Sequence, residues 1–157
     1  MDSAIQQSSK KNLLEKYSPK NCMLHAGKVK TIEEAMNSKA PSIGRFQNEH
    51  GSQFTEGLMT FWLLYLNKIL NLNKPMSEDQ INLCSSMIVE EFYMLKISDL
   101  TLLFKKIISG QYGEFYERLS IDKVLTFFRE YLDERLNLAE VNSIRNHSDE
   151  IYKSKNI

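Results

Sequence analysis

The sequence predicts an all-α protein, a single-domain helical bundle of about five main helices behind a short N-terminal arm that is either helical or disordered. Apolar residues recur at the three- and four-residue intervals of a buried helix face. Capping patterns mark helix starts, whereas the apolar–polar alternation of strands is nearly absent. The 157 residues, 42% of them hydrophobic and 25% charged, suffice for one soluble domain with a core.

The first thirty residues form the predicted arm. Residues 3–17 predict a weak polar helix that ends before Ser18-Pro19, and residues 20–30 predict an irregular segment. Six lysines face two acids here, which gives a local formal charge of +4. The arm is either a solvated, partly disordered tail or a segment that contacts nucleic-acid phosphates. Its lysines are Lys10, Lys11, Lys16, Lys20, Lys28 and Lys30.

Two short helices should follow the arm. The stretch from Thr31 to Glu34 is a capping-box pattern, because Thr31 can accept from an early backbone N–H while Glu34 reaches back. That helix should stop near Ser38. Pro41 at a first helical position, with Ser42 as a cap, predicts another short helix that ends within residues 47–50.

Two longer amphipathic helices come next. The first should bury one face, made of Phe54, Leu58, Phe61, Trp62, Tyr65, Ile69 and Leu72, and end at Asn73-Lys74-Pro75. Ser77 and Gln80 form a capping box for the second helix. Its predicted buried side carries Ile81, Cys84, Met87, Ile88 and Leu95. Ser98 or Asp99 should cap a further helix that ends at Gly110, and Ser120 should begin the last one, which runs toward Tyr152.

The turn Gly110-Gln111-Tyr112-Gly113 separates two aromatic helices. Glycines concentrate where the backbone needs a positive φ or a close approach, so this turn predicts the corner of a bundle. Its Gly-x-x-Gly spacing also matches a KH nucleic-acid loop, but that module needs a sheet that the sequence does not predict. The neighbouring aromatics either seal the corner or form a partner-binding or base-stacking surface. They are Tyr112, Phe115 and Tyr116, with Arg118, Lys105 and Lys106 supplying charge.

Arg135 continues the apolar stripe of the last helix, which consists of Val124, Phe127, Phe128, Tyr131 and Leu132. Arg135 either pairs with an acidic residue across the bundle, with its stem on Tyr131, or offers its guanidinium to a partner or a phosphate. Farther on, Val141, Ile144 and Ile151 form a shifted, thinner stripe. That tail either frays or docks on a protein partner or a second copy of the chain.

No set of catalytic or metal-binding residues stands out. Zinc needs about four converging ligands, and Cys22 with His25 is the one closely spaced pair. The sequence contains no Glu-x-x-His element, no P-loop and no Gly-x-Ser-x-Gly elbow. Acidic residues of the helices, such as Glu114 and Glu134, are typical of solvated faces or ion pairs. We therefore predict no enzyme, no cofactor and no metal.

Charge, cysteines and hydropathy limit the remaining classes. Twenty basic and twenty acidic side chains cancel, so the strongly basic signature of a stand-alone nucleic-acid binder is missing. Two cysteines without a secretory signal indicate a reducing compartment, and we expect a cytoplasmic protein. The longest apolar run, residues 58–72, is too short and too polar to span a bilayer.

Several short motifs, taken together, carry a family resemblance between Thr31 and Glu140. They are Ala40-Pro41-Ser42-Ile43, the Trp62 helix, Leu100 to Phe104 leading into Gly110-x-Tyr112-Gly113, and Tyr131-x-x-x-Arg135. In these features the chain resembles small helical proteins of bacteriophages and mobile elements of Bacteroides-like bacteria. The resemblance implies an accessory protein of a mobile genetic element. It implies no catalytic residues.

Two functional hypotheses follow from the sequence. The first is a non-enzymatic adaptor that binds a protein partner through Tyr112, Phe115, Tyr116, Arg118 and Arg135, or through the late helix. The second is a DNA- or RNA-binding replication accessory factor that uses the lysines of the arm with Lys105 and Lys106. Residues 1–30 form the predicted arm, residues 31–140 the core domain and residues 141–157 a helical extension or tail, through which the chain could also pair with itself.

Overall fold

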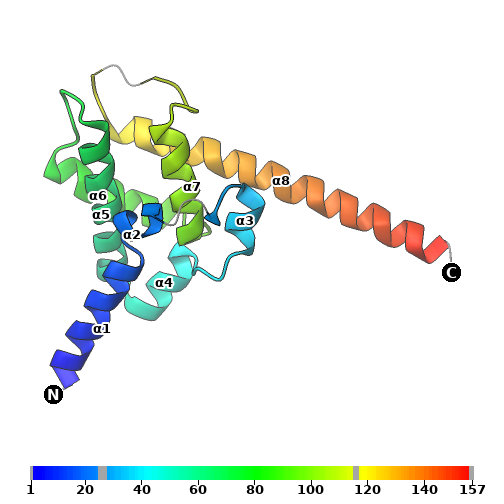
Figure 1. The fold of residues 1–157 in the computed structure, drawn as a ribbon, viewed down its shortest axis with the longest axis horizontal. Helices are drawn as coiled ribbons and strands as arrows, with labels where there is room; N and C mark the ends of the chain where they lie inside the picture. The colour runs from blue at the N-terminus through cyan, green and yellow to red at the C-terminus, as the bar shows by residue number, and fades with distance from the viewer. Residues whose placement is uncertain (1, 25–27, 115–116, 156–157) are drawn as a thin grey trace.

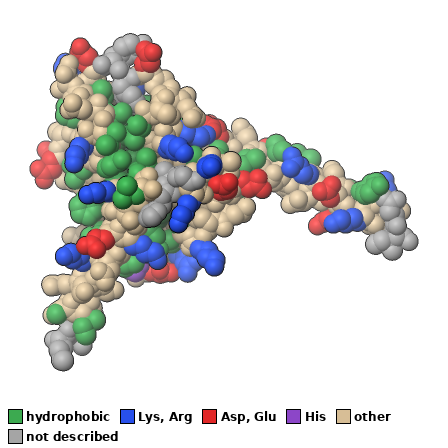
Figure 2. Space-filling model, viewed as in Figure 1, with side chains coloured by type: hydrophobic (Ala, Val, Ile, Leu, Met, Phe, Trp, Pro, Cys, Tyr) green, Lys and Arg blue, Asp and Glu red, His purple; other side chains and the backbone are tan. Residues whose placement is uncertain are grey.

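The computed structural model describes residues 2–24, 28–114 and 117–155. These residues form α1 (Asp2–Lys16), α2 (Pro19–Leu24), α3 (Ile32–Asn37), α4 (Ile43–His50), α5 (Ser52–Leu70), α6 (Glu78–Glu91), α7 (Ile97–Ile108) and α8 (Ile121–Lys155). Most of them gather into one body, from which the second half of α8 extends (Figures 1 and 2). The predicted all-α, single-domain fold is confirmed. Across the described ranges, no helix is both long and apolar enough to cross a bilayer.

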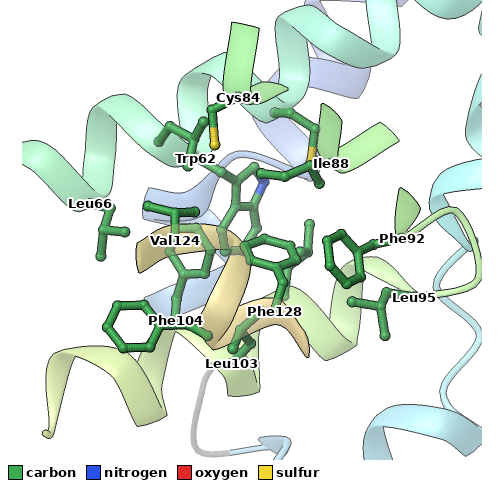
Figure 3. Packing of buried hydrophobic residues seen from close by; sticks show 14 of the residues in the cluster. Trp62, Leu66, Cys84, Ile88, Phe92, Leu95, Leu103, Phe104, Val124 and Phe128 are labelled. Carbon is green, nitrogen blue, oxygen red and sulfur yellow. The ribbon is translucent and has the colours of Figure 1, made fainter. Parts of the chain in front are cut away.

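Aromatic rings from separate elements meet at the centre of the body. Trp62 of α5 packs edge-on against Phe104 of α7, with ring centroids 5.0 Å apart. Phe104 is edge-on to Phe128 of α8 at 6.4 Å, and Phe128 lies 5.1 Å from Phe92, which follows α6 (Figure 3). All four rings are buried. Because large aromatic side chains contribute much of the free energy of burial, this chain of rings joins α5, α6, α7 and α8.

α7 is the helix around which the others are arranged. Its residues from Ile97 to Phe104 are all buried, and it contacts α2, α3, α5 and α8. The segment before it is held by backbone bonds, because the N–H groups of Ile43 and Gly44 donate to the carbonyls of Leu95 and Tyr93. These bonds set the start of α4 beside the start of α7.

The segment predicted to be irregular after Pro19 contains α2, and it belongs to the body. Ser18 accepts from the Asn21 N–H and Pro19 occupies the first helical position. Ser18-Pro19 therefore begins α2, whereas the sequence predicted only the end of the preceding helix there. Pro19 is buried, and the Trp62 indole Nε1–H donates to the Tyr17 carbonyl at 3.0 Å. Within the expected arm, α2 thus packs on the body, whereas the side chains of α1 are mostly exposed.

The predicted buried face of α5 is partly wrong. Leu58 and Trp62 are buried as expected, but Phe61 and Ile69 are exposed. The face that enters the core consists instead of Thr55, Leu58, Met59, Trp62, Leu63 and Leu66. α5 is apolar on nearly all sides, so three- and four-residue spacing fits more than one face.

Several predicted helix ends are confirmed and others shift. Ser77 and Gln80 form the expected capping box, and Thr31 accepts from the Glu34 N–H. Glu34 reaches back to the Lys30 N–H. Ser42 caps α4, so Pro41 lies before the helix and not inside it. Shifts of this size are common because helix ends compete with local capping bonds.

The start of α7 differs more from the prediction. Lys96 is the N-cap residue, so the expected caps Ser98 and Asp99 lie inside the first turn and are buried. α7 ends at Ile108, two residues before the predicted end at Gly110. α8 then runs unbroken to Lys155, so residues 141–155 continue the last helix, one of the two expected forms of this segment.

The adjacent leucines of α5 test which face enters the core. Leu63 is 1% exposed and Leu64 is 47% exposed. We expect Leu63→Ala to lower the free energy of unfolding by about 2–5 kcal/mol, because it leaves a cavity. Leu64→Ala should change it by less than about 1 kcal/mol. Urea unfolding followed by circular dichroism measures both; equal losses would contradict this register of α5.

Candidate interaction surfaces

Asp99 is a fully buried carboxylate at the start of α7. Its Oδ2 accepts the Lys96 backbone N–H at 2.7 Å, and its Oδ1 accepts the Tyr131 hydroxyl of α8 at 2.6 Å. The Arg135 Nε lies 3.2 Å from Oδ2 and neutralises its charge. A buried charge is tolerated when it is paired and hydrogen-bonded, as this one is. Asp99 thus joins α7 to α8.

Arg135 therefore takes the first of its two predicted roles, pairing with an acidic residue across the bundle. Its side chain is only 15% exposed, and its partner Asp99 is fully buried. The predicted role of Arg135 in binding a partner or a phosphate stays a prediction, now for a side chain whose Nε is paired with Asp99. The sequence thus predicts that Arg135 pairs with an acidic residue, but it does not indicate that this residue is Asp99.

Lys106 and Glu134 form a second link between α7 and α8. The Lys106 Nζ donates to Glu134 Oε2 at 2.6 Å and lies 5.8 Å from the centre of the Tyr131 ring. Lys106 was predicted as a nucleic-acid contact together with Lys105. The structure separates these neighbours, since Lys105 is exposed while the Lys106 charge is already paired.

Tyr112 belongs to the corner between α7 and α8. Gly110 and Gly113 adopt positive φ angles of 82° and 110°, as the turn required. The half-buried Tyr112 ring stacks on Phe127, with centroids 6.0 Å apart. Its packing role, one of the two predicted alternatives, is thus the observed one. The other two predicted aromatics, Phe115 and Tyr116, lie outside the described residues.

Arg118 is exposed on the segment that leads into α8. It lies in a short bridge to Lys74, in which the Lys74 N–H donates to the Glu117 carbonyl and the Leu119 N–H donates to the Lys74 carbonyl. This bridge fastens the connection to the α5–α6 loop. Among the five predicted partner-binding residues, Arg118 is the one that the described structure leaves at the surface.

The predicted basic residues before Thr31 are all exposed, and they are spread over α1, α2 and the segment between α2 and α3. Lys10, Lys11 and Lys16 point from α1 in different directions, since a helix turns by about 100° per residue. Lys16 lies 5.3 Å from the Tyr17 ring. Lys20 lies on α2, and Lys28 and Lys30 lie between α2 and α3.

The outer half of α8 carries apolar side chains without cover. Ile144 is 61% exposed, and Leu136, Val141, Ile151 and Tyr152 are exposed as well. Ile144 follows Tyr131 by thirteen residues, a rotation that brings it to roughly the opposite side of the helix. We call Val141, Ile144 and Ile151 the arm stripe. It faces away from the side of α8 that packs on the body.

The candidate metal ligands do not gather into a site in the described part of the chain. No group of three or more His, Cys, Asp or Glu side chains there has a suitable arrangement. His25 lies outside the described residues. Burial raises the pKa of Cys22 to about 11 and that of Cys84 to about 12, so both are thiols at neutral pH.

Comparison with protein-family models, with curated proteins and with solved structures finds no match to this chain.

Substitution of two arginines of α8 measures how much the Asp99–Arg135 pair contributes to the free energy of unfolding. Arg135→Met should lower the free energy of unfolding by about 2–4 kcal/mol, because it leaves the buried carboxylate unpaired. Arg129 is 54% exposed and pairs with Glu91 on the surface, so Arg129→Met should cost less than about 1 kcal/mol. Chemical denaturation compares them. Similar losses would show that the buried pair contributes no more than the exposed one.

Alkaline pH should destabilise the fold through Tyr131. Burial, and then the Asp99 carboxylate, raise the pKa of Tyr131 well above its ordinary value. Above a pH of about 10 the unfolded chain releases a phenol proton that the folded chain retains, so stability falls as pH rises. Tyr131→Phe should be less stable at pH 7 but lose less stability above pH 10. Urea midpoints from pH 7 to 11 provide the measurement.

Proposed function

We propose that this protein is a non-enzymatic interaction module, an adaptor that acts through protein contacts in a bacteriophage or mobile-element setting. The arm stripe of α8 is the observation that carries the proposal. Val141, Ile144 and Ile151 keep exposed apolar side chains along a helix that leaves the body. The resemblance to helical proteins of phages and mobile elements supplies the biological setting.

The structural form of α8 supports protein binding. The Asp99–Arg135 pair and the aromatic core fix its first half, while its outer half projects from the body (Figure 1). Exposed apolar residues repeated at helical spacing are typical of helices that lie in a groove of another protein. Burying the arm stripe on a partner would remove this apolar area from water, which favours association.

A second copy of the chain is an alternative occupant of the arm stripe. Val141, Ile144, Ser148 and Ile151 follow the three–four–three spacing of a coiled-coil seam. The seam is short and is interrupted by Ser148, which favours a different protein that supplies a deeper groove. Sedimentation equilibrium distinguishes these occupants, since self-pairing depends on protein concentration.

Ile144→Asp tests the adaptor proposal. The change sets a charge in the arm stripe, so it should abolish co-purification of partners from the host lysate at unchanged thermal stability. Asn146→Asp introduces the same charge on another side of exposed α8 and should leave co-purification intact. If Ile144→Asp and Val141→Asp both recover every partner, the arm stripe is not the contact surface.

Nucleic-acid binding is the second candidate function, since every lysine of residues 10–30 is exposed. Phosphate contacts would release counterions and make binding strongly dependent on salt. Removal of the first thirty residues would not test this function cleanly. It would also take away Pro19 and the Tyr17 carbonyl, which belong to the body.

Point substitutions separate charge from folding. Lys→Gln at positions 10, 11, 20 and 28 should weaken binding to a labelled single-stranded oligonucleotide and reduce its salt dependence, if the lysines contact phosphates. Fluorescence anisotropy at low salt measures both. Absence of binding by the unsubstituted protein to single- and double-stranded probes would exclude this second function.

A further inference from the structure

The outward face of α5 is unusually apolar. Phe61 and Leu64 are 44% and 47% exposed, and Ile69 is also exposed. The opposite side of the same helix supplies Trp62, Leu63 and Leu66 to the core. Gln53, Gly57 and Lys68 of α5 are exposed as well, so the apolar part of this face consists of a few large side chains. Exposed apolar side chains that lie together often mark a contact surface.

α1 and α2 border this face at Phe61, whereas Leu64 and Ile69 line neither of the two hollows formed there. Leu14 of α1, Pro19 and Leu24 of α2, and Phe61 of α5 line a hollow of about 700 Å³. A second hollow of about 730 Å³ also borders Leu14 and Phe61 and continues to Phe54 and Asn82. The two hollows share Leu14 and Phe61 in their linings, and we call them together the α1–α5 groove. Figure 2 shows hydrophobic side chains gathered on the body among scattered Lys and Arg.

The rim of the α1–α5 groove is basic. Lys10 borders one hollow, and Lys11 and Lys20 border the other, whereas Glu15 is the one acid lining either. Within the described chain, Lys11 and Lys20 form no ion pair. The apolar floor and the unpaired lysines favour an occupant with apolar and acidic side chains together.

We propose that the α1–α5 groove binds an amphipathic helix of a partner protein, with apolar residues against Leu14 and Phe61 and acidic residues against the lysines. This inference rests on the proposed adaptor function and names a second surface and the chemistry of its partner. An amphipathic helix satisfies its own backbone hydrogen bonds, so it can lie in an apolar groove without leaving N–H or C=O groups unpaired.

Two other occupants fit the groove less well. A nucleic-acid strand would use the lysines but would leave Leu14 and Leu24 without an apolar counterpart. The α8 arm of a second copy would fill the floor, but it carries three acids and three bases between residues 136 and 155, so it has no net charge to match the rim. An acidic helix matches both features.

Synthetic peptides provide the test. Two labelled helical peptides of about five turns share one Leu and Phe stripe, and their flanks carry Glu in one and Lys in the other. We expect the Glu peptide to bind the full chain at least about tenfold more tightly than the Lys peptide, with affinity that falls as salt rises. Equal binding of both peptides, or binding of neither, would overturn the proposal.

Variants then locate the binding. Phe61→Asp should abolish Glu-peptide binding, whereas Ile144→Asp on α8 should leave it unchanged. The double change Lys11→Glu with Lys20→Glu alters only exposed side chains and should reverse the preference toward the Lys peptide. Loss with Ile144→Asp but not with Phe61→Asp would assign the peptide to α8 and overturn the groove assignment.

The remaining outcomes separate this inference from the adaptor function. An oligonucleotide that displaces the Glu peptide would assign the lysines to phosphate. A dimer that Phe61→Asp converts to monomer would assign the groove to a second copy, and either result overturns the inference. If groove variants keep all natural partners while Ile144→Asp loses them, the adaptor function stands without the groove. If groove and arm variants alike keep every partner, the adaptor function itself fails.

Discussion

The arrangement of the helices depends on the hydrogen bonds and the ion pair of the buried Asp99 carboxylate. It accepts from the first turn of its own helix through Lys96 N–H and from α8 through the Tyr131 hydroxyl, and its charge is balanced by Arg135. The next residue back, Ser98, donates to the Ala35 carbonyl of α3. Hydrophobic contacts are non-directional, so they tolerate small rotations of a helix about its axis. The hydrogen bonds of Asp99 do not, and they select one orientation of α8.

The aromatic core and this polar junction have different physical roles. The chain of rings from Trp62 to Phe92 buries large apolar area and joins four elements. The bonds of Asp99 with Tyr131 and Arg135 instead fix the orientation of α8. Their contribution to stability is smaller, because replacing a buried ion pair by apolar residues of similar volume is often neutral. α5 serves both the core and the surface, with Trp62 on one side and Phe61 on the other. Each proposed contact surface therefore includes a helix that the core holds in place, α5 for the groove and α8 for the arm stripe.

Local signals in the sequence predicted much of the fold, and contacts between distant residues explain most of the errors. The caps at Ser77 and Ser42 depend on neighbours three residues away, so the sequence alone predicts them. The acid opposite Arg135 lies 36 positions earlier, and a single sequence does not reveal such a pairing. Phe61 fits the spacing of a core face, but the positions of α2, α4, α6 and α7 decide which side of α5 is covered. Because the sequence does not show which side of α5 is covered, it does not reveal the α1–α5 groove. The one relevant signal is the large number of apolar residues in this helix.

Because α8 is one continuous helix, a small rotation near Tyr131 moves its far end by a larger distance. From Tyr131 at the junction to Lys155 the helix extends by roughly 36 Å at 1.5 Å per residue. A rotation of about 10° at the junction would displace the far end by about 6 Å, more than one helical turn's rise. Small adjustments around one carboxylate are thereby amplified at the distal tip. A force on the tip, in turn, acts on all the contacts that hold α8, among them the Asp99 bonds and the Lys106–Glu134 pair.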